Sequence, residues 1–166
     1  MSELIYKEIE KKDEKQLREL INNALQDLEN PEFFIPFKDD DIENMFNKNK
    51  AITYGAYDNE KLVATGQLYL EEEYVKEIKE KLCIANKKVS EFGGYLVLPN
   101  YRNQGVMRQI QERLTLEAKK MNFEYAIITA HPDNKPSNNV IKHSGAELIK
   151  TTHLEGYLRN IYLLKL

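Results

Sequence analysis

The chain has 166 residues, of which 42% are hydrophobic and 31% are charged, and its formal net charge is −3. This length and composition predict one soluble globular domain over residues 1–166, and the acidic balance argues against a general nucleic-acid-binding protein. No apolar run approaches the roughly 20 residues of a membrane span, and the charged residues 1–12 do not resemble a signal peptide. The single cysteine, Cys83, excludes an internal disulfide, so we expect a cytoplasmic protein with a buried or half-buried structural thiol.

In the first half of the chain, apolar residues alternate in some segments and recur at helical spacing in others. The alternation predicts strands at residues 4–9, 51–57 and 61–70. The helical spacing predicts helices at residues 14–28, 39–47 and 71–86. Between these elements, the aromatic segment Phe33–Phe37 is expected to be a loop, and Asp58-Asn59-Glu60 a hairpin turn.

The second half predicts a strand–helix–strand unit followed by a short helix and two strands. The expected elements are a strand at 88–98, a helix at 105–121, a strand at 125–130, a helix ending near residue 143, and strands at 146–152 and 157–164. Gly93 and Gly94 interrupt the fourth strand, and paired glycines in a strand mark a bulge or the close approach of another backbone. The element order predicts a mixed α/β fold.

The most informative stretch runs from Val97 to Arg108 and joins the fourth strand to the long helix through a turn. Such a turn presents unpaired backbone N–H groups and the positive end of the helix dipole, which together bind anions. Arg102 and Arg108 add guanidinium donors suited to phosphate. An ordinary strand–turn–helix connection has the same local chemistry, so other residues must decide between the two interpretations.

This stretch resembles the acetyl-CoA signature of the GNAT superfamily of N-acetyltransferases. The signature is an apolar strand with Val-x-Pro-x-x-Arg, followed by Arg/Gln-x-x-Gly-x-Gly/Ala at the start of a helix. Its matching positions here are Val97, Pro99, Arg102 and Gly105. Met107 departs from it, because the family has Gly or Ala there, and a larger side chain narrows the turn that receives the pyrophosphate.

A second stretch, residues 134–146, resembles another pattern of the same family, in which Asn-x-x-Ala/Ser and an apolar residue precede Lys-x-Gly-Phe. Its matching positions are Asn134, Ser137, Val140 and Gly145. Lys142 stands one position before the usual lysine, and Ala146 replaces the phenylalanine. The element order is also that of the GNAT fold, so the resemblance extends over most of the chain.

The resemblance implies a central, mostly antiparallel twisted sheet of about seven strands, with splayed fourth and fifth strands and flanking helices. In this family the pantetheine arm of acetyl-CoA pairs with unpaired backbone groups of the fourth strand, which here belong to Leu96, Val97 and Leu98. The pyrophosphate is implied to lie against the turn formed by Asn103, Gln104, Gly105, Val106, Met107 and Arg108. Asn134 is implied to bind the pantetheine or thioester end, with Ser137 nearby.

Acetyl transfer to an amine requires a general base, because an amine with a pKa of about 10.4 is mostly protonated near neutral pH. Glu91 is the first candidate, since some family members have a basic glutamate at the matching position; a surface carboxylate is the alternative. His131, at the end of the fifth strand, is the rival base, and otherwise a turn residue before a proline. Ile141 stands where many relatives carry a tyrosine general acid, for which Tyr157 and Tyr101 are the replacements considered.

We therefore expect an N-acetyltransferase that transfers an acetyl group from acetyl-CoA to a primary amine of a small molecule or peptide by direct attack. A non-catalytic acyl-CoA-binding sensor is an alternative, because Met107 and Ile141 depart from the family. A transferase that uses a longer acyl-CoA is another. The scattered histidines and the single cysteine predict no metal site. Neither nucleic acid nor a membrane is an expected partner, and by resemblance the C-terminal strands can form a homodimer.

Overall fold

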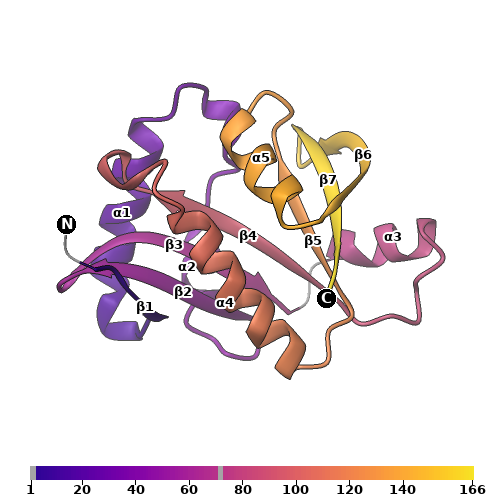
Figure 1. Ribbon diagram of the computed structural model, residues 1–166, viewed down its shortest axis with the longest axis horizontal. Coiled ribbons are helices and arrows are strands. Elements are labelled where there is room, and N and C mark those ends of the chain that lie inside the picture. Colours follow the sequence, from indigo (N-terminus) through magenta and orange to yellow (C-terminus); the bar gives the residue numbers. More distant parts are fainter. Residues whose placement is uncertain (1–2, 71–72) are drawn as a thin grey trace.

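The computed structural model describes residues 3–70 and 73–166. A seven-stranded sheet with the order β1-β2-β3-β4-β5-β7-β6 runs through the molecule (Figure 1). Its strands are β1 (Ile5–Glu8), β2 (Ala51–Asp58), β3 (Lys61–Tyr69), β4 (Val89–Val97), β5 (Tyr125–Ala130), β6 (Glu147–Leu154) and β7 (Tyr157–Lys165). The α-helices are α1 (Glu14–Gln26), α2 (Asp39–Asn44), α3 (Glu73–Lys81), α4 (Val106–Lys120) and α5 (Lys135–His143). This arrangement confirms the mixed α/β fold expected from the sequence.

Most deviations from the predicted elements lie at their ends. Short 3₁₀ turns at Lys11–Asp13, Pro31–Phe33 and Pro99–Tyr101 were not expected. The predicted helix at 71–86 is observed only as α3, and residues 71 and 72 lie outside the described residues. The expectation of a buried or half-buried Cys83 is wrong: the residue is exposed, with a φ of 58°. This left-handed conformation ends the helical path, so Cys83 does not continue the apolar face of α3.

The sheet opens between its fourth and fifth strands. β4 and β5 are parallel and pair only from Val89 with Tyr125 to Phe92 with Ile128, whereas every other strand pair is antiparallel. Beyond Phe92, β4 remains paired with β3 and β5 remains paired with β7. The expected splay of the two strands is therefore present, and it begins at the glycine pair.

A β-bulge in β4 marks the start of this opening. Gln67 pairs with Gly93 and Thr65 pairs with Leu96, so two residues of β4 lie opposite one residue of β3. Gly94 has a φ of 63°, and a Cβ atom there would overlap the side-chain oxygen of Gln67. Only glycine meets both demands, and this explains the interruption that the sequence showed.

Helices cover both faces of the sheet near this opening (Figure 1). On one face, Ile110 and Leu114 of α4 pack into the largest apolar cluster with residues of β3, β4 and β5. On the other face, α1 presents Leu17, Leu20, Ile21 and Ala24, whose spacing forms one apolar stripe. Leu96 of β4 belongs to this second cluster. The end of β4 is thus held between α1 and α4.

A buried carboxylate fixes the 3₁₀ turn Lys11–Asp13, which leads into α1. Asp13 accepts hydrogen bonds from the backbone N–H of Glu10 and from the Tyr57 hydroxyl, each at 3.0 Å. Burial and the hydrogen bond to Asp13 raise the pKa of Tyr57, so its hydroxyl stays protonated and donates.

Among the described residues, no helix combines the length and apolar composition required to cross a lipid bilayer.

Candidate active site

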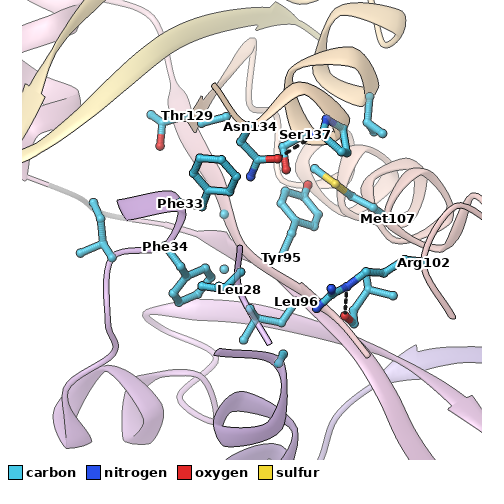
Figure 2. A pocket seen from close by; sticks show the side chains of 18 of the residues that line it. Leu28, Phe33, Phe34, Tyr95, Leu96, Arg102, Met107, Thr129, Asn134 and Ser137 are labelled. Carbon is cyan, nitrogen blue, oxygen red and sulfur yellow. Dashed lines mark hydrogen bonds between the residues drawn. The ribbon is translucent and has the colours of Figure 1, made fainter. Parts of the chain in front are cut away.

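A cavity of about 760 Å³ lies where β4 and β5 diverge (Figure 2). Its walls come from the end of α1, the aromatic segment Phe33–Phe37, the end of β4, the turn before α4, the start of α5 and the β6–β7 hairpin. The sequence-predicted residues that line it are Glu91, Leu96, Val97, Arg102, Asn103, Gly105, Val106, Met107, Arg108, Asn134 and Ser137. Leu98, Gln104 and His131 are not among its lining residues.

The turn before α4 presents backbone donors to this cavity. Asn103 and Gly105 have φ values of 60° and 76°, and the left-handed Gly105 precedes the first residue of the 15-residue helix. Within residues 3–70 and 73–166, no protein acceptor pairs with the backbone N–H groups of residues 105–108. Free N–H groups at the positive end of a helix dipole form a site for an anion such as a pyrophosphate.

The two arginines of the turn differ in what they contact. The Arg102 guanidinium donates through Nε to the Val97 carbonyl at 3.0 Å and through Nη1 to Asp27 at 2.9 Å. Arg102 therefore links the end of β4 to the end of α1 instead of pointing unpaired at a ligand. Arg108 is exposed, and its Nε lies 3.4 Å from Oε1 of Glu112. Because exposed ion pairs contribute little to stability, Arg108 can leave Glu112 and bind a phosphate instead.

Met107 occupies the position where the family has a small residue. Its partly buried side chain packs against the largest apolar cluster and also lines the cavity. In Figure 2 the Met107 sulfur is directed toward Ser137 at the start of α5. The side chain therefore fills space between α4 and α5, on the side of the cavity next to the turn before α4.

Fewer backbone groups of β4 are free to bind a ligand than the sequence predicted. Leu98 donates its N–H to the carbonyl of Val63 at 3.0 Å, so this donor is used within the sheet, contrary to the expectation for Leu98. In an antiparallel ladder, the backbone N–H and C=O groups of successive residues point alternately to one neighbouring strand and to the other side. Those of Leu96 therefore point toward β3, as those of Leu98 do, and those of Val97 point into the opening between β4 and β5. The Val97 carbonyl already accepts from Arg102, which leaves its N–H for a ligand.

Glu91 lies at the opposite end of this strand opening. It pairs with Tyr69 on β3 and with Ile127 on β5, and its side chain is half-buried. Its carboxylate leans over Gly93, because a Cβ built on that glycine would lie 3.5 Å from Oε1 of Glu91. The carboxylate thus sits at the edge of the bulge, where the cavity passes between the strands.

His131 occupies a different environment from Glu91. Its side chain is only 8% exposed, and Nδ1 accepts the backbone N–H of Asp133 at 3.1 Å. The ring also lies 5.3 Å from the ring of Phe33, centroid to centroid. These contacts are those of a turn residue, the alternative that the sequence left open for His131.

The start of α5 is organised by two asparagines. Asn134 caps the helix, since its side-chain oxygen accepts the N–H of Ser137 at 3.4 Å, and its amide NH₂ remains to donate into the cavity. Asn138 is 5% exposed and donates to the carbonyls of His131 and Asn134, both at 2.8 Å. Its oxygen accepts from Tyr162 at 2.6 Å and from Asn160 at 3.0 Å. Sequence analysis missed Asn138, whose only signal was its place next to Ser137.

The position of the missing tyrosine general acid is closed to a ligand. Ile141 is fully buried in the largest apolar cluster. Tyr101 lines the cavity, but its hydroxyl donates to Asp58 at 2.7 Å. Tyr157 packs its ring under Arg159 and is not a lining residue. Neither replacement considered from the sequence therefore offers its hydroxyl to the cavity.

Tyr95, which sequence analysis missed, does place a hydroxyl in this region. In Figure 2 its ring extends from β4 at the wall of the cavity, with the hydroxyl toward Ser137 and Met107. The hydroxyl oxygen has less than 1 Å² of exposed surface and no hydrogen-bond partner among the described residues. Burial raises the pKa of Tyr95 well above its ordinary value, so the group remains a donor. The signal available in the sequence was an aromatic residue directly after the glycine pair.

Comparison with known proteins agrees with this geometry. The profile of the acetyltransferase (GNAT) family matches residues 22–146, whereas a search of curated proteins finds no match. An acetyltransferase structure from Streptococcus agalactiae 2603 is 22% identical, with a TM-score of 0.74 and 100% of both chains covered. Arabidopsis thaliana NAA60 in complex with acetyl-CoA is 13% identical, with a TM-score of 0.76 and 98% of both chains covered.

A further similar structure is FeeM, described as an N-acyl amino acid synthase from uncultured soil microbes. It is 12% identical, has a TM-score of 0.75, and the match covers 99% of this chain and 92% of FeeM. At these identities the structural likeness shows the fold, whereas the profile covers well over half of the sequence. The chain therefore belongs to the acetyltransferase (GNAT) family.

Proposed function

We propose that this protein is an acetyl-CoA-dependent N-acetyltransferase that acts on a primary amine. The observation that carries the proposal is one continuous cavity that joins the free N–H groups before α4 to the Glu91 carboxylate. An anion-binding end, a channel with backbone donors and a carboxylate at the far end are what this reaction needs. The solved complex of NAA60 with acetyl-CoA has the same fold, which supports the choice of cosubstrate.

The residues around the cavity fit acetyl-CoA group by group. Unpaired N–H groups of residues 105–108 suit the pyrophosphate, with Arg108 as an additional cation. The N–H of Val97 and the amide of Asn134 are donors for the pantetheine and thioester oxygens. The orphaned hydroxyl of Tyr95 fits the same polar arm, because a buried donor without a partner is costly until a ligand satisfies it.

Acetyl-CoA, when bound, supplies an acyl thioester whose carbonyl carbon a neutral amine can attack, with the thiolate as leaving group. In our proposal the Glu91 carboxylate takes the proton from the ammonium, directly or through one water molecule. The N–H of Val97, six residues along β4 from Glu91, suits an amide oxygen of the pantetheine arm and not the thioester itself. Ile141 stands where many relatives carry a tyrosine general acid, and the hydroxyl of Tyr95, which stays protonated, is a proton donor on the same side of the cavity.

The test compares Glu91→Gln with the wild type in two assays. We expect the rate of acetylation of a broad amine panel to fall by about 10²- to 10⁴-fold, the usual contribution of a general base. Acetyl-CoA affinity, measured by calorimetry, should stay within about twofold, because Gln keeps the shape of the side chain. Glu147→Gln on the exposed edge strand β6 is the control and should change neither.

The outcomes separate the competing functions. Retained turnover in Glu91→Gln would remove Glu91 from the base role while leaving the acetyltransferase proposal intact. Binding of acetyl-CoA without acyl transfer to any amine would instead favour the non-catalytic sensor. Cytoplasmic location and homodimer formation remain predictions, for which cell fractionation and light scattering are the direct measurements.

A second candidate function is transfer of a longer acyl group. The cavity continues past Glu91 along the aromatic segment Phe33–Phe37, and FeeM, described as an N-acyl amino acid synthase, shares the fold. Apolar walls of this kind favour an alkyl chain by about 0.8 kcal/mol for each buried methylene. If this second function is correct, kcat/KM will rise with acyl chain length across a series from acetyl-CoA to decanoyl-CoA.

A further inference from the structure

A buried arginine at the start of β7 has one guanidinium nitrogen without a hydrogen-bond partner among the described residues. Arg159 is 2% exposed, and its Nη1 donates to the carbonyls of Glu32 at 2.8 Å and Leu158 at 2.7 Å. Within the described part of the chain, its Nη2 is buried without a hydrogen-bond partner, and the Glu32 carboxylate acts on the guanidinium charge without forming an ion pair with it. Burial lowers the pKa of the guanidinium from its ordinary value, although an arginine side chain remains charged.

A buried N–H donor without a hydrogen-bond partner is costly, and a ligand oxygen that accepts from Nη2 would remove that cost. Arg159 lines the same cavity as Glu91. It lies at the end of the cavity away from the turn before α4, because its Nη1 bond reaches Glu32, next to Phe33. In Figure 2, Phe33 and Thr129 lie on the side opposite Met107 and Arg102. Arg159 is therefore on the acceptor side.

The sheet register puts Arg159 and Glu91 on one face. Glu91 pairs with Ile127 on β5, and Thr129 on the same strand pairs with Ile161 on β7. Strand residues two apart share a face, so Glu91, Thr129 and Arg159 all face the α1 side of the sheet. The backbones of Glu91 and Arg159 are two strands apart, with a spacing of about 5 Å between neighbouring strands, and four residues apart along the strand direction. This separation leaves room for a small molecule between their side chains.

We propose that the acceptor amine carries a carboxylate, which Arg159 binds through Nη2. The substrate class is then an amino-carboxylic acid whose amine approaches Glu91 while its carboxylate meets the guanidinium. This inference rests on the proposed acetyltransferase function and specifies its acceptor. Because Nη1 is used by two carbonyls, Nη2 is the donor for a charge-assisted hydrogen bond to the carboxylate, and the aromatic walls from Phe33 to Phe37 suit an apolar body between the charges.

The experiment measures discrimination between matched acceptors. Apolar α-amino acids and ω-amino acids of increasing length are each compared with their carboxamides, which keep the amine and lose the anion. We expect the wild type to favour the carboxylate of its best pair by about 10- to 100-fold in kcat/KM, the range of a hydrogen bond to a charged group. In Arg159→Met the ratio should fall to about one. In the control Arg113→Met, whose arginine stacks on Tyr6 outside the cavity, the wild-type ratio should remain.

A purely structural role for Arg159 gives a different result. Loss of the bond to the Glu32 carbonyl would lower kcat/KM for carboxylate and carboxamide alike, so their ratio would stay at the wild-type value and overturn the inference. Equal use of both acceptors by the wild type would also overturn it while leaving the acetyltransferase proposal intact.

Calorimetry provides a readout that does not depend on turnover. The N-acetylated form of the best amino acid should bind the wild type and lose about tenfold or more in affinity for Arg159→Met. If no acyl transfer is found with any acceptor, the acetyltransferase proposal fails. Binding of these carboxylates that depends on Arg159 would then still support the carboxylate site, and its absence would reject that site too.

Discussion

Tyr162 is buried in the largest apolar cluster and Tyr95 is partly buried against it, and their hydroxyls differ in their hydrogen-bond partners. The Tyr162 hydroxyl donates to Asn138 at 2.6 Å, whereas the Tyr95 hydroxyl has no partner among the described residues. A buried donor that lacks an acceptor in the free protein lowers stability, and the same donor strengthens a complex that supplies one. The two residues therefore allow a ligand-binding hydroxyl to be separated from a structural one.

We predict opposite effects for the two phenylalanine substitutions. Tyr95→Phe should leave the free energy of unfolding unchanged or raise it by up to about 1 kcal/mol, and should lower acetyl-CoA affinity about fivefold or more. Tyr162→Phe should lower the free energy of unfolding by about 1–2 kcal/mol, because it leaves Asn138 with one acceptor site less satisfied. Urea unfolding and calorimetry measure the two quantities. An acetyl-CoA affinity that Tyr95→Phe does not change would show that the hydroxyl points at no part of the cosubstrate.

Single residues also show what a sequence conceals. Glu91 was identified because relatives carry a basic glutamate there, and the fold places it at the cavity. Arg159 carried no motif, because its meaning depends on Glu32, which is 127 positions away and accepts its hydrogen bond. Leu98 was expected to offer a free backbone donor, yet its use depends on the register with Val63. Long-range pairing of this kind is not visible in local patterns.

At the level of elements, α5 is held in place by one side chain. Asn138 joins the end of β5, the first turn of α5 and strand β7 through hydrogen bonds of 2.6–3.0 Å. Because Asn134 lies in that first turn, its amide can meet a ligand only while Asn138 holds the helix. Both the NH₂ group and the oxygen of the Asn138 side chain have hydrogen-bond partners, and a buried network satisfied in this way holds its members in a single geometry.

Asn138→Ala should therefore weaken both stability and binding. We expect the free energy of unfolding to fall by about 1–3 kcal/mol, since the Tyr162 hydroxyl and the His131 carbonyl lose a buried partner. Acetyl-CoA affinity should fall as well, because the start of α5 shifts. The control Lys142→Ala, on the exposed side of the same helix, should stay within about 0.5 kcal/mol of the wild type. Loss of stability with unchanged affinity would show that α5 is positioned by its other contacts.

The elements were predictable to the extent that local chemistry defines them. The Gly93-Gly94 pair indicated the bulge that opens the sheet, since only glycine tolerates the φ of Gly94 beside Gln67. The helix from 71 to 86 was overextended, because periodicity continued through Leu82 while the backbone turned at Cys83. Apolar spacing gives the existence of a helix, but its end depends on backbone conformations that spacing does not encode.

At the scale of the whole molecule, the cavity exists because distant parts of the chain meet. Segments near residues 27–41, 91–108, 129–140 and 154–159 all contribute to its wall. The sequence motifs lie in the second and third of these, which form the side that we propose for the nucleotide. The proposed acceptor side comes from the aromatic segment and the β6–β7 hairpin, which carry no recognisable pattern. The fold could thus be predicted from the sequence, whereas the proposed acceptor site became visible only in the assembled structure.

This division of the cavity predicts how the whole molecule responds to its cosubstrate. A ligand that binds only the folded state at 100 times its dissociation constant adds about 2.7 kcal/mol of stability. For a chain of this length we expect acetyl-CoA to raise the melting temperature by about 5–10 °C. Acetylpantetheine lacks the nucleotide and its pyrophosphate, so at equal concentration it should give a much smaller shift.

The same melting experiment assigns the roles of Met107 and the turn. In Met107→Ala the space between α4 and α5 widens, so the acetyl-CoA shift should grow by a few degrees while the unliganded melting temperature falls because packing is lost. Met121→Ala, in the same apolar cluster but away from the cavity, is the control and should lower the melting temperature without changing the shift.

Equal shifts with acetyl-CoA and acetylpantetheine would mean that the N–H groups before α4 do not receive the pyrophosphate. The absence of any shift with either compound would contradict acetyl-CoA as the cosubstrate and leave the fold assignment unaffected.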